Sequence, residues 1–363
     1  SEFKEFNKIS WVATAYLLSS AAFQPLYGKV SDIFGRKPLL IFTNIAFLIG
    51  CLICGLSKSL WWLVLGRFIS GIGGGGMTSI SSITITDIVP LRERALYQGI
   101  CNFFFGLGTG CGGIIGGWFS DSFGGWRMAF LVQVPLSAIS TFMIVMFLEL
   151  PKKNGKEHPN SKALNIKSKL MAIDWSGAIT LITFLGLFLI TASLGGKEIP
   201  FDSNIFLIMC LLSVLSFVIF VFIELRVASD PILPLSFLKD RSVLGSSLSN
   251  WFCMMSIMTT SYYLPVYFSG VLNMKPTAIG KRIAPNFFST SLGSLGAGYY
   301  MKKTGKYYWF VILFCVSVVL GQLQIYLMKP DIATWRQYTL TMIPGFGTSV
   351  LITVALLAMI AAV

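Results

Sequence analysis

Two charged sites stand out because each lies within or between long apolar runs. In residues 28–38, Asp32 and Arg36 are four positions apart, a spacing at which an acid and a cation can pair across one helical turn. Arg67 lies inside the apolar run that begins at Leu60. A guanidinium within an apolar helix is costly and must face a partner or a wet cavity, so Arg67 is a functional hypothesis. The alternative is that Arg67 lies near enough to the helix end to extend into water.

The elements that carry these residues are apolar runs of membrane-spanning length. The chain has 363 residues, of which 55% are hydrophobic and 12% charged, with a mean hydropathy of +0.74. Soluble domains have about 25% charged residues, and about 20 apolar residues cross a bilayer as a helix. We therefore predict an all-α, polytopic membrane protein with eleven spans: Ile9–Tyr27, Pro38–Leu56, Leu60–Val89, Ala95–Phe119, Met128–Leu150, Trp175–Leu194, Ile205–Leu225, Val243–Phe268, Ile283–Met301, Tyr307–Met328 and Tyr338–Val363.

The cations responsible for the net charge of +13 are distributed unequally between the two sides of the predicted membrane spans. Lysine and arginine number seventeen on the side that carries residues 28–38 and ten on the other, which places residues 28–38 in the cytosol. Because the cations lie in loops between spans, we expect a lipid bilayer as partner and no nucleic acid. The sequence shows no metal cluster, nucleophile triad or phosphate loop, so we expect no cofactor, no metal and no enzyme activity.

The polar segments divide the chain. Residues 151–173 contain six lysines and the only histidine, His158, and have the composition of a solvated cytosolic linker. Residues 230–239 are predicted to form an amphipathic segment on the membrane face. A weak repeat of the Gly28–Lys37 pattern occurs at Gly298–Lys306, without an acid at the position of Asp32. Such repeats are expected of two helical bundles related by an axis along the membrane normal.

The arrangement Gly28-x-x-x-Asp32-x-x-Gly35-Arg36-Lys37 resembles the loop between the second and third helices of the major facilitator superfamily. The resemblance implies the major facilitator fold, with two helical bundles. Two additional spans between the bundles resemble the fourteen-span drug:proton antiporter branch of that family. On this numbering the first span here is the family's second helix, and the family's first and last two helices are expected to be missing from this chain.

The resemblance also implies domain boundaries. The expected parts are an N-terminal bundle at 1–150 (family helices 2–6), the cytosolic linker at 151–173, two linking spans at 174–226 (helices 7–8), the amphipathic segment at 227–242 and an incomplete C-terminal bundle at 243–363 (helices 9–12).

Three groups of residues gain roles from the same resemblance. Arg67-x-x-x-Gly71-x-Gly73 is similar to a family signature whose arginine takes part in proton coupling, usually opposite an acid on the first helix. Residues 106–117 are similar to the glycine-rich fifth helix of antiporters, with Gly113 where proline is usual. A conformational latch is implied for Asp32, Arg36, Asp87, Arg92 and Arg94, which otherwise form surface ion pairs worth about 0–1 kcal/mol. Close helix packing is expected at Gly71, Gly73, Gly108, Gly112, Gly116 and Gly117.

Polar residues inside the spans are candidates for a substrate cavity. Each is also a candidate for a hydrogen bond between helices, which is the commoner role of such residues. The candidates are Tyr16, Gln24, Asn102, Asn250, Tyr262 and Asn286.

Two classes of function fit these features. The first is a monomeric proton-coupled secondary transporter, and the second is a receptor or scaffold that kept the fold without transport. Residues 11–18, 23–32 and 86–94 resemble fungal vacuolar basic amino-acid transporters. That resemblance implies antiport of lysine, arginine or histidine into the vacuole in exchange for protons. The alternative is a multidrug:proton antiporter of the plasma membrane.

Overall fold

The computed structural model describes residues 10–122, 125–150, 174–196, 199–227, 232, 239–274, 276–304, 308–330 and 332–362. These residues are helical nearly throughout, and their only extended pairing is an isolated bridge between Gly195 and Ile199. The predicted linker at 151–173, with His158, and most of the predicted amphipathic segment lie outside the described residues. The described helices pack into two units, which we treat separately.

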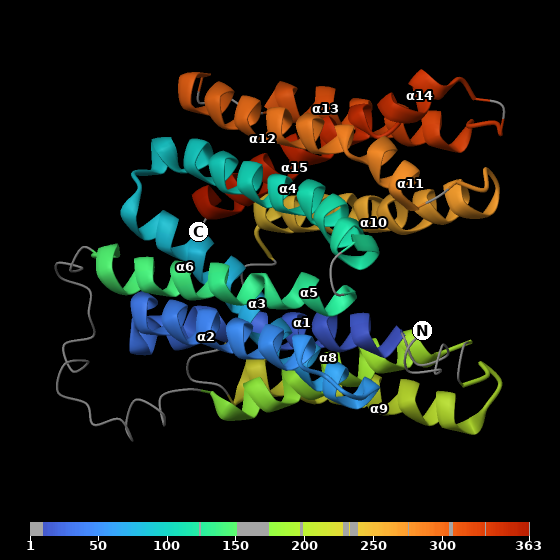
Figure 1. Ribbon diagram of the computed structural model, residues 1–363. Helices are drawn as coiled ribbons and strands as arrows, with labels where there is room; N and C mark the ends of the chain where they lie inside the picture. Colours follow the sequence, from blue (N-terminus) through green and yellow to red (C-terminus); the bar gives the residue numbers. More distant parts are fainter. Residues whose placement is uncertain are drawn as a thin grey trace. The chain divides into compact units, whose positions relative to one another are not determined.

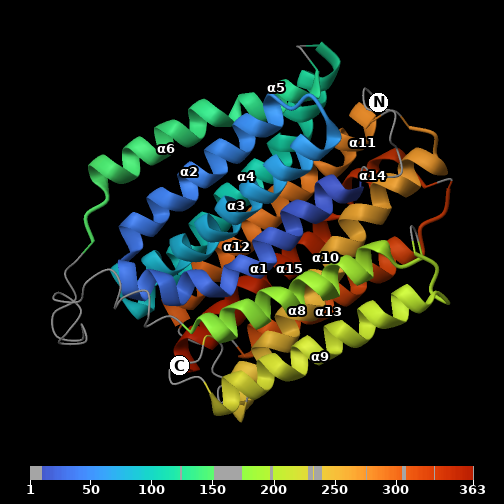
Figure 2. The same cartoon turned by 90° about the horizontal axis from the view of Figure 1, so that it is seen from below.

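Unit 1 comprises residues 1–84 and 126–235. Within it, α2 lies along α5 and α6, α8 lies beside α9, and α1 contacts both α2 and α8 (Figures 1 and 2). Side-chain oxygens of Asp174 and Ser203 cap α8 and α9 by accepting from the backbone N–H groups of Gly177 and Phe206. Its helices are α1 (Ser10–Phe34), α2 (Arg36–Gly55), most of α3 (Leu60–Ile88), α5 (Trp126–Leu131), α6 (Gln133–Phe147), α8 (Trp175–Leu194) and α9 (Asn204–Arg226).

Unit 2 comprises residues 85–125 and 236–363. In this unit α12 lies between α4 and α15, and α15 also contacts α10 and α13 (Figure 2). Ala297, Met301, Val350 and Val354 form one buried apolar cluster of this unit, at the contact of α12 with α15. Its helices are α4 (Leu91–Ser122), α10 (Arg241–Gly270), α11 (Pro276–Ile283), α12 (Pro285–Thr304), α13 (Tyr308–Tyr326), α14 (Thr334–Thr339) and α15 (Met342–Ala362). The predicted domain boundaries stay a prediction.

Every predicted span contains a helix, but three spans are interrupted. The breaks fall at Val132, at Ala284 and at Leu340–Thr341. A proline follows each break within four residues, at 135, 285 and 344. Proline has no N–H to donate and its ring clashes with the carbonyl four residues earlier, which accounts for the interruptions.

The predicted spans Ile9–Tyr27 and Pro38–Leu56 leave residues 28–37 as a turn, and that prediction was wrong in its extent. Helix α1 continues through Gly28 to Phe34, and α2 begins at Arg36. The connection is the single residue Gly35, whose φ of 93° lies in the left-handed region that glycine adopts without steric cost. Because Lys29, Val30 and Ser31 have no helix-breaking property, the α1 helix extends to the one residue that can reverse it.

Six helical segments of the described chain are long and apolar enough to cross a membrane. The other long helices, α1, α3, α4, α10 and α12, carry more glycine, serine, threonine or charge, which lowers their mean hydropathy. The fold is therefore all-α and polytopic, as the composition predicts. The six segments are Arg36–Gly55, Trp126–Phe147, Trp175–Leu194, Asn204–Arg226, Tyr308–Tyr326 and Thr334–Met359.

Helix α3 packs closely against two neighbours because glycines line two of its faces. On the α2 side, a Cβ atom added to Gly66 would lie 2.9 Å from the backbone nitrogen of Cys54, and one added to Gly73 would lie 2.6 Å from the carbonyl oxygen of Thr43. On the α1 side, Cβ atoms at Gly71 and Gly75 would approach backbone oxygens of α1 to 2.5 and 2.9 Å. Small residues let helix backbones approach in this way inside a membrane.

We predict that Gly73→Ala destabilises the protein by about 1–3 kcal/mol, because the added methyl group meets backbone atoms of α2 that cannot rotate away. The matched control is Gly186→Ala in α8, where no described atom lies within 4 Å of an added Cβ. Alanine there should leave stability unchanged or raise it by up to about 1 kcal/mol. Thermal unfolding of both variants in detergent measures the difference, and equal midpoints would contradict this account of α3.

Candidate functional site

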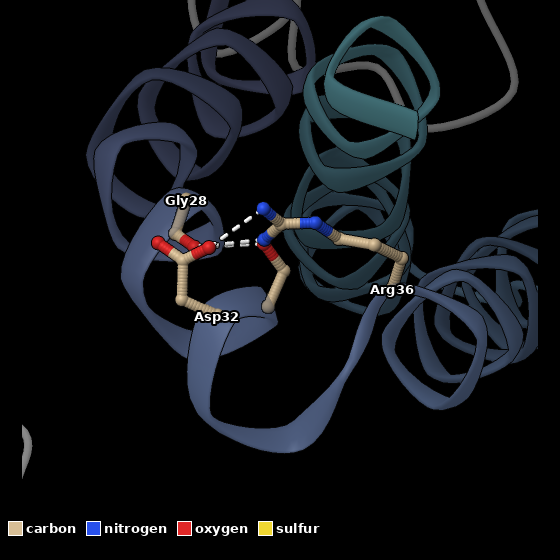
Figure 3. A network of polar contacts seen from close by, with 4 residues as sticks. Gly28, Asp32 and Arg36 are labelled. Carbon is tan, nitrogen blue, oxygen red and sulfur yellow. Dashed lines mark hydrogen bonds and ion pairs between the residues drawn. The ribbon is translucent and has the colours of Figure 1, made fainter. Parts of the chain in front are cut away.

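The ion pair expected between Asp32 and Arg36 is present at the junction of α1 and α2 (Figure 3). Arg36 Nη2 lies 2.6 Å from Asp32 Oδ1, and Arg36 Nη1 donates to the Gly28 carbonyl oxygen at 3.5 Å and to the Ser31 hydroxyl. The arginine side chain is 12% exposed and the aspartate side chain 58% exposed. The guanidinium thus crosses the break at Gly35 and holds the start of α2 against the last turns of α1.

The other three predicted latch residues belong to unit 2. Asp87 lies in the last turn of α3, and Arg94 Nε donates to the Val89 carbonyl oxygen at 3.1 Å. Arg92 lies in α4, and its side chain is outside the described residues. A latch role for these residues stays a prediction.

Glu93 forms an ion pair that the sequence analysis did not anticipate. Its Oε1 lies 2.9 Å from Lys302 Nζ, which joins the first turn of α4 to the last turn of α12. Lys302 occupies the position in the Gly298–Lys306 repeat that Asp32 occupies in the first pattern. The lysine at the acid position was a signal in the sequence for a reversed pairing, but it did not indicate which acid is the partner.

Arg67 is held in unit 1 by contacts from α1 and α5. Its Nε donates to the Val12 carbonyl oxygen at 3.3 Å, and its Cζ lies 4.4 Å from the ring centroid of Tyr16 and 5.8 Å from that of Phe130. Cation–π contacts of this kind stabilise a desolvated guanidinium by up to about 2 kcal/mol. No carboxylate of the described residues forms an ion pair with Arg67.

Arg67 lies inside α3 rather than at its end. It follows Leu60, the first residue of α3, by seven positions, or about 10 Å along the helix axis. Trp61 and Trp62, both more than half exposed, lie at the start of α3, where aromatic residues mark the edge of a bilayer. The side chain contacts the α1 carbonyl oxygen and the two rings, and the alternative of a side chain that extends into water stays open.

The predicted cavity residues are divided between the two units. Tyr16 and Gln24 lie on α1 in unit 1, whereas Asn102, Asn250, Tyr262 and Asn286 lie in unit 2. Asn102 Nδ2 donates to Thr353 Oγ1 at 3.2 Å, and Thr353 also contacts the Ser294 hydroxyl at 3.0 Å. Asn102 therefore takes part in a hydrogen-bonded contact of α4 with α12 and α15.

Two cavities in unit 2 are lined by none of the six candidates. A cavity of about 10 Å³, near the size of one water molecule, lies among Thr86, Arg94, Gln98 and Thr353. A larger crevice of about 200 Å³ lies between α10, α13 and α15, and its polar lining is Ser246, Ser249 and Tyr308.

The predicted packing glycines differ in their surroundings. Gly71 and Gly73 lie in the close contacts of α3 described above. On α4, the approach to α12 occurs at Gly99, Gly106 and Gly110, where added Cβ atoms would meet α12 atoms at 2.9 to 3.3 Å. No described atom lies within 4 Å of a Cβ added at Gly108, Gly112 or Gly116, and the surroundings of Gly117 are outside the described residues.

Several curated relatives with similar sequences come from fungi. The chain is 40% identical over 307 residues to the vacuolar membrane amino acid uptake transporter fnx2 of Schizosaccharomyces pombe, and 40% identical to the multidrug resistance protein fnx1 of the same organism. It is 36% identical over 300 residues to the vacuolar basic amino acid transporter 2 of Saccharomyces cerevisiae. These alignments cover 81% to 85% of this chain but 52% to 62% of the relatives. The chain therefore spans little more than half the length of the curated relatives it matches.

The fold is similar to that of a solved transporter. The crystal structure of the human organic anion transporter MFSD10 superimposes with a TM-score of 0.57, covering 97% of this chain and 75% of that one at 15% identity. The family profile described as Major Facilitator Superfamily matches residues 2–363. Together with the helical fold and the ion pair at the α1–α2 junction, this match shows that the chain belongs to the major facilitator superfamily.

Proposed function

We propose that this protein is a proton-coupled antiporter that moves lysine, arginine or histidine into the vacuole by alternating access. The observation that carries the proposal is Arg67, a cation about 10 Å inside α3 that is held by a carbonyl oxygen and two aromatic rings. A receptor or scaffold gains nothing from a charge at that depth, whereas a carrier needs one to bind a solute or to respond to a proton. Arg67 is accordingly the proposed proton-coupling residue.

The names of the relatives support the substrate and the membrane. One relative at 40% identity is named as a vacuolar amino acid uptake transporter, and one at 36% as a vacuolar basic amino acid transporter. The assignment to the fourteen-span branch belongs to the same proposal, because α8 and α9 supply two linking spans between the earlier and later helices. We propose that the protein acts as a monomer.

A second candidate is a multidrug:proton antiporter of the plasma membrane. It is favoured by the relative named multidrug resistance protein fnx1, which is as similar to this chain as the amino acid transporter is. The two candidates require different solutes: the first recognises an amino acid with its carboxylate, and the second a lipophilic cation.

Solute competition in vesicles distinguishes these candidates. The full-length protein in vesicles with an acidic interior should accumulate labelled lysine, and a protonophore should abolish accumulation because the proton gradient drives it. Excess arginine should compete, whereas tetraphenylphosphonium should not. The reverse pattern of competition would favour multidrug antiport, and no proton-dependent flux of either solute would favour the non-transporting alternative.

We also propose that the Asp32–Arg36 pair belongs to a cytosolic latch, and we predict that Asp32→Asn slows lysine transport at least about 10-fold at unchanged abundance. The aspartate is 58% exposed, and exposed ion pairs contribute only about 0–1 kcal/mol to stability. The matched control is Asp202→Asn, which replaces an exposed acid in the α8–α9 loop and should change neither the transport rate nor the abundance of folded protein. Transport rate and folded protein are measured together, and a parallel loss of both in Asp32→Asn would discard the latch.

The Glu93–Lys302 pair is proposed to act in the same way within unit 2. Both side chains are about 40% exposed, so the pair should matter for rate rather than for stability. In a double-mutant cycle we predict that Glu93→Gln and Lys302→Gln each slow transport about 5-fold and that the double variant is no slower than either single variant. If the two single effects instead multiplied, so that the double variant was about 25-fold slower, the two residues would act independently.

A further inference from the structure

The guanidinium of Arg67 has one edge that the described chain leaves open. Its Nε donates a hydrogen bond to the Val12 carbonyl oxygen, whereas Nη1 and Nη2 donate to no acceptor in the described residues. Within the described residues, the outer edge of the guanidinium therefore carries two donor nitrogens that no protein acceptor uses.

The surrounding residues fix the plane and direction of that edge. Tyr16 and Phe130 each place a ring near the guanidinium, at 4.4 and 5.8 Å from Cζ, and Val12 holds the Nε side. Tyr16 is itself fixed against α3, because Cβ atoms at Gly71 and Gly74 would collide with its carbonyl group and its ring hydroxyl. The glycines of α3 thus have a specific effect: they let the Tyr16 ring approach the arginine.

The chemistry of the open edge selects the ligand. With Nε occupied, the remaining pair of nitrogens presents two parallel N–H donors, the geometry that matches the two oxygens of a carboxylate. The site is cationic, lies about 10 Å inside α3 and has no acid of the described residues paired with it. A desolvated cation gains most from a ligand that brings a negative charge and two acceptors.

We infer that Arg67 is the carboxylate anchor of the substrate site, binding the α-carboxylate of an amino acid through Nη1 and Nη2 between the Tyr16 and Phe130 rings. The inference rests on the proposed function, in which the solute is an amino acid. It goes further by stating which end of the solute Arg67 recognises, and it makes Tyr16 a residue that positions the anchor. The cationic side chain of the solute is then recognised elsewhere.

Lysine and lysinamide separate this role from others, because lysinamide has a neutral carboxamide in place of the α-carboxylate. We expect the full-length wild-type protein in detergent to bind lysine about 30-fold more tightly than lysinamide, as measured from ligand-dependent thermal shifts. In Arg67→Gln, lysine affinity should fall about 30-fold while lysinamide affinity stays within about 3-fold. The preference for the carboxylate should therefore disappear.

The matched control is Arg127→Gln in the same unit. Arg127 also donates to a carbonyl oxygen, that of Ser57, and also lies over a ring, that of Trp126, at 4.7 Å. Its loss should lower stability but keep the preference for lysine over lysinamide. If Arg67→Gln fails to fold, Arg67→Lys keeps the charge without the paired donors, and it should still reduce the preference about 5-fold or more.

Each outcome decides the inference. An unchanged preference in the Arg67 variants overturns it while leaving basic amino-acid transport intact, and Arg67 would then act on an acid of the protein itself. If wild-type protein binds tetraphenylphosphonium but neither lysine nor lysinamide, both the proposed substrate and this inference fail. Collapse of the preference in the Arg67 variants alone supports the carboxylate anchor.

Discussion

The close approach of α3 to α1 and α2 is the constraint on which the rest of unit 1 depends. In a bilayer there is no hydrophobic driving force between helices, so their association relies on packing and hydrogen bonds. Glycines at 66 and 73 admit α2, and glycines at 71 and 75 admit α1. Tyr27 reinforces the second contact by donating from its hydroxyl to the Ile72 carbonyl oxygen. A single cation can be held between α1 and α3 because their backbones are this close.

Several charged groups of the described residues join one helix to another. Arg36 spans the break between α1 and α2, and the Glu93–Lys302 pair joins α4 to α12. Lys37 donates to the Val145 carbonyl oxygen near the end of α6 at 2.8 Å, and Arg282 donates to Gln337 Oε1 at 2.6 Å, which connects α11 to α14. Each of these contacts lies near a helix end, where unsatisfied carbonyls and water lower the cost of a charge.

The fold could be predicted from the sequence because apolar run length and charge spacing are local signals. Helices occur in all eleven predicted spans, and Asp32 pairs with Arg36 as their spacing indicates. The same local signals did not identify the breaks after Val132 and Ala284, because proline is tolerated inside α1 and α10, at Pro25 and Pro265.

Contacts between distant helices were harder to predict. Which glycines of α4 meet α12 depends on the rotation of α4 about its axis, and the glycine-rich run offers two faces that look alike in the sequence. The surroundings of Arg67 depend on Val12, Tyr16 and Phe130, which come from two other helices and have no common pattern. The residue could be singled out from the sequence, but its partners required the structure.

Helix α1 also contacts α8. Thr14 Oγ1 and Ser193 Oγ lie 2.9 Å apart, and Leu26 packs against the cluster formed by α8 and α9. Thr14 and Tyr16 are two residues apart on one rigid helix, so any rotation of α1 that takes the tyrosine ring off Arg67 must also strain or break the hydroxyl contact with α8. The pair α8–α9 and the surroundings of Arg67 thus share contacts with the same helix, α1.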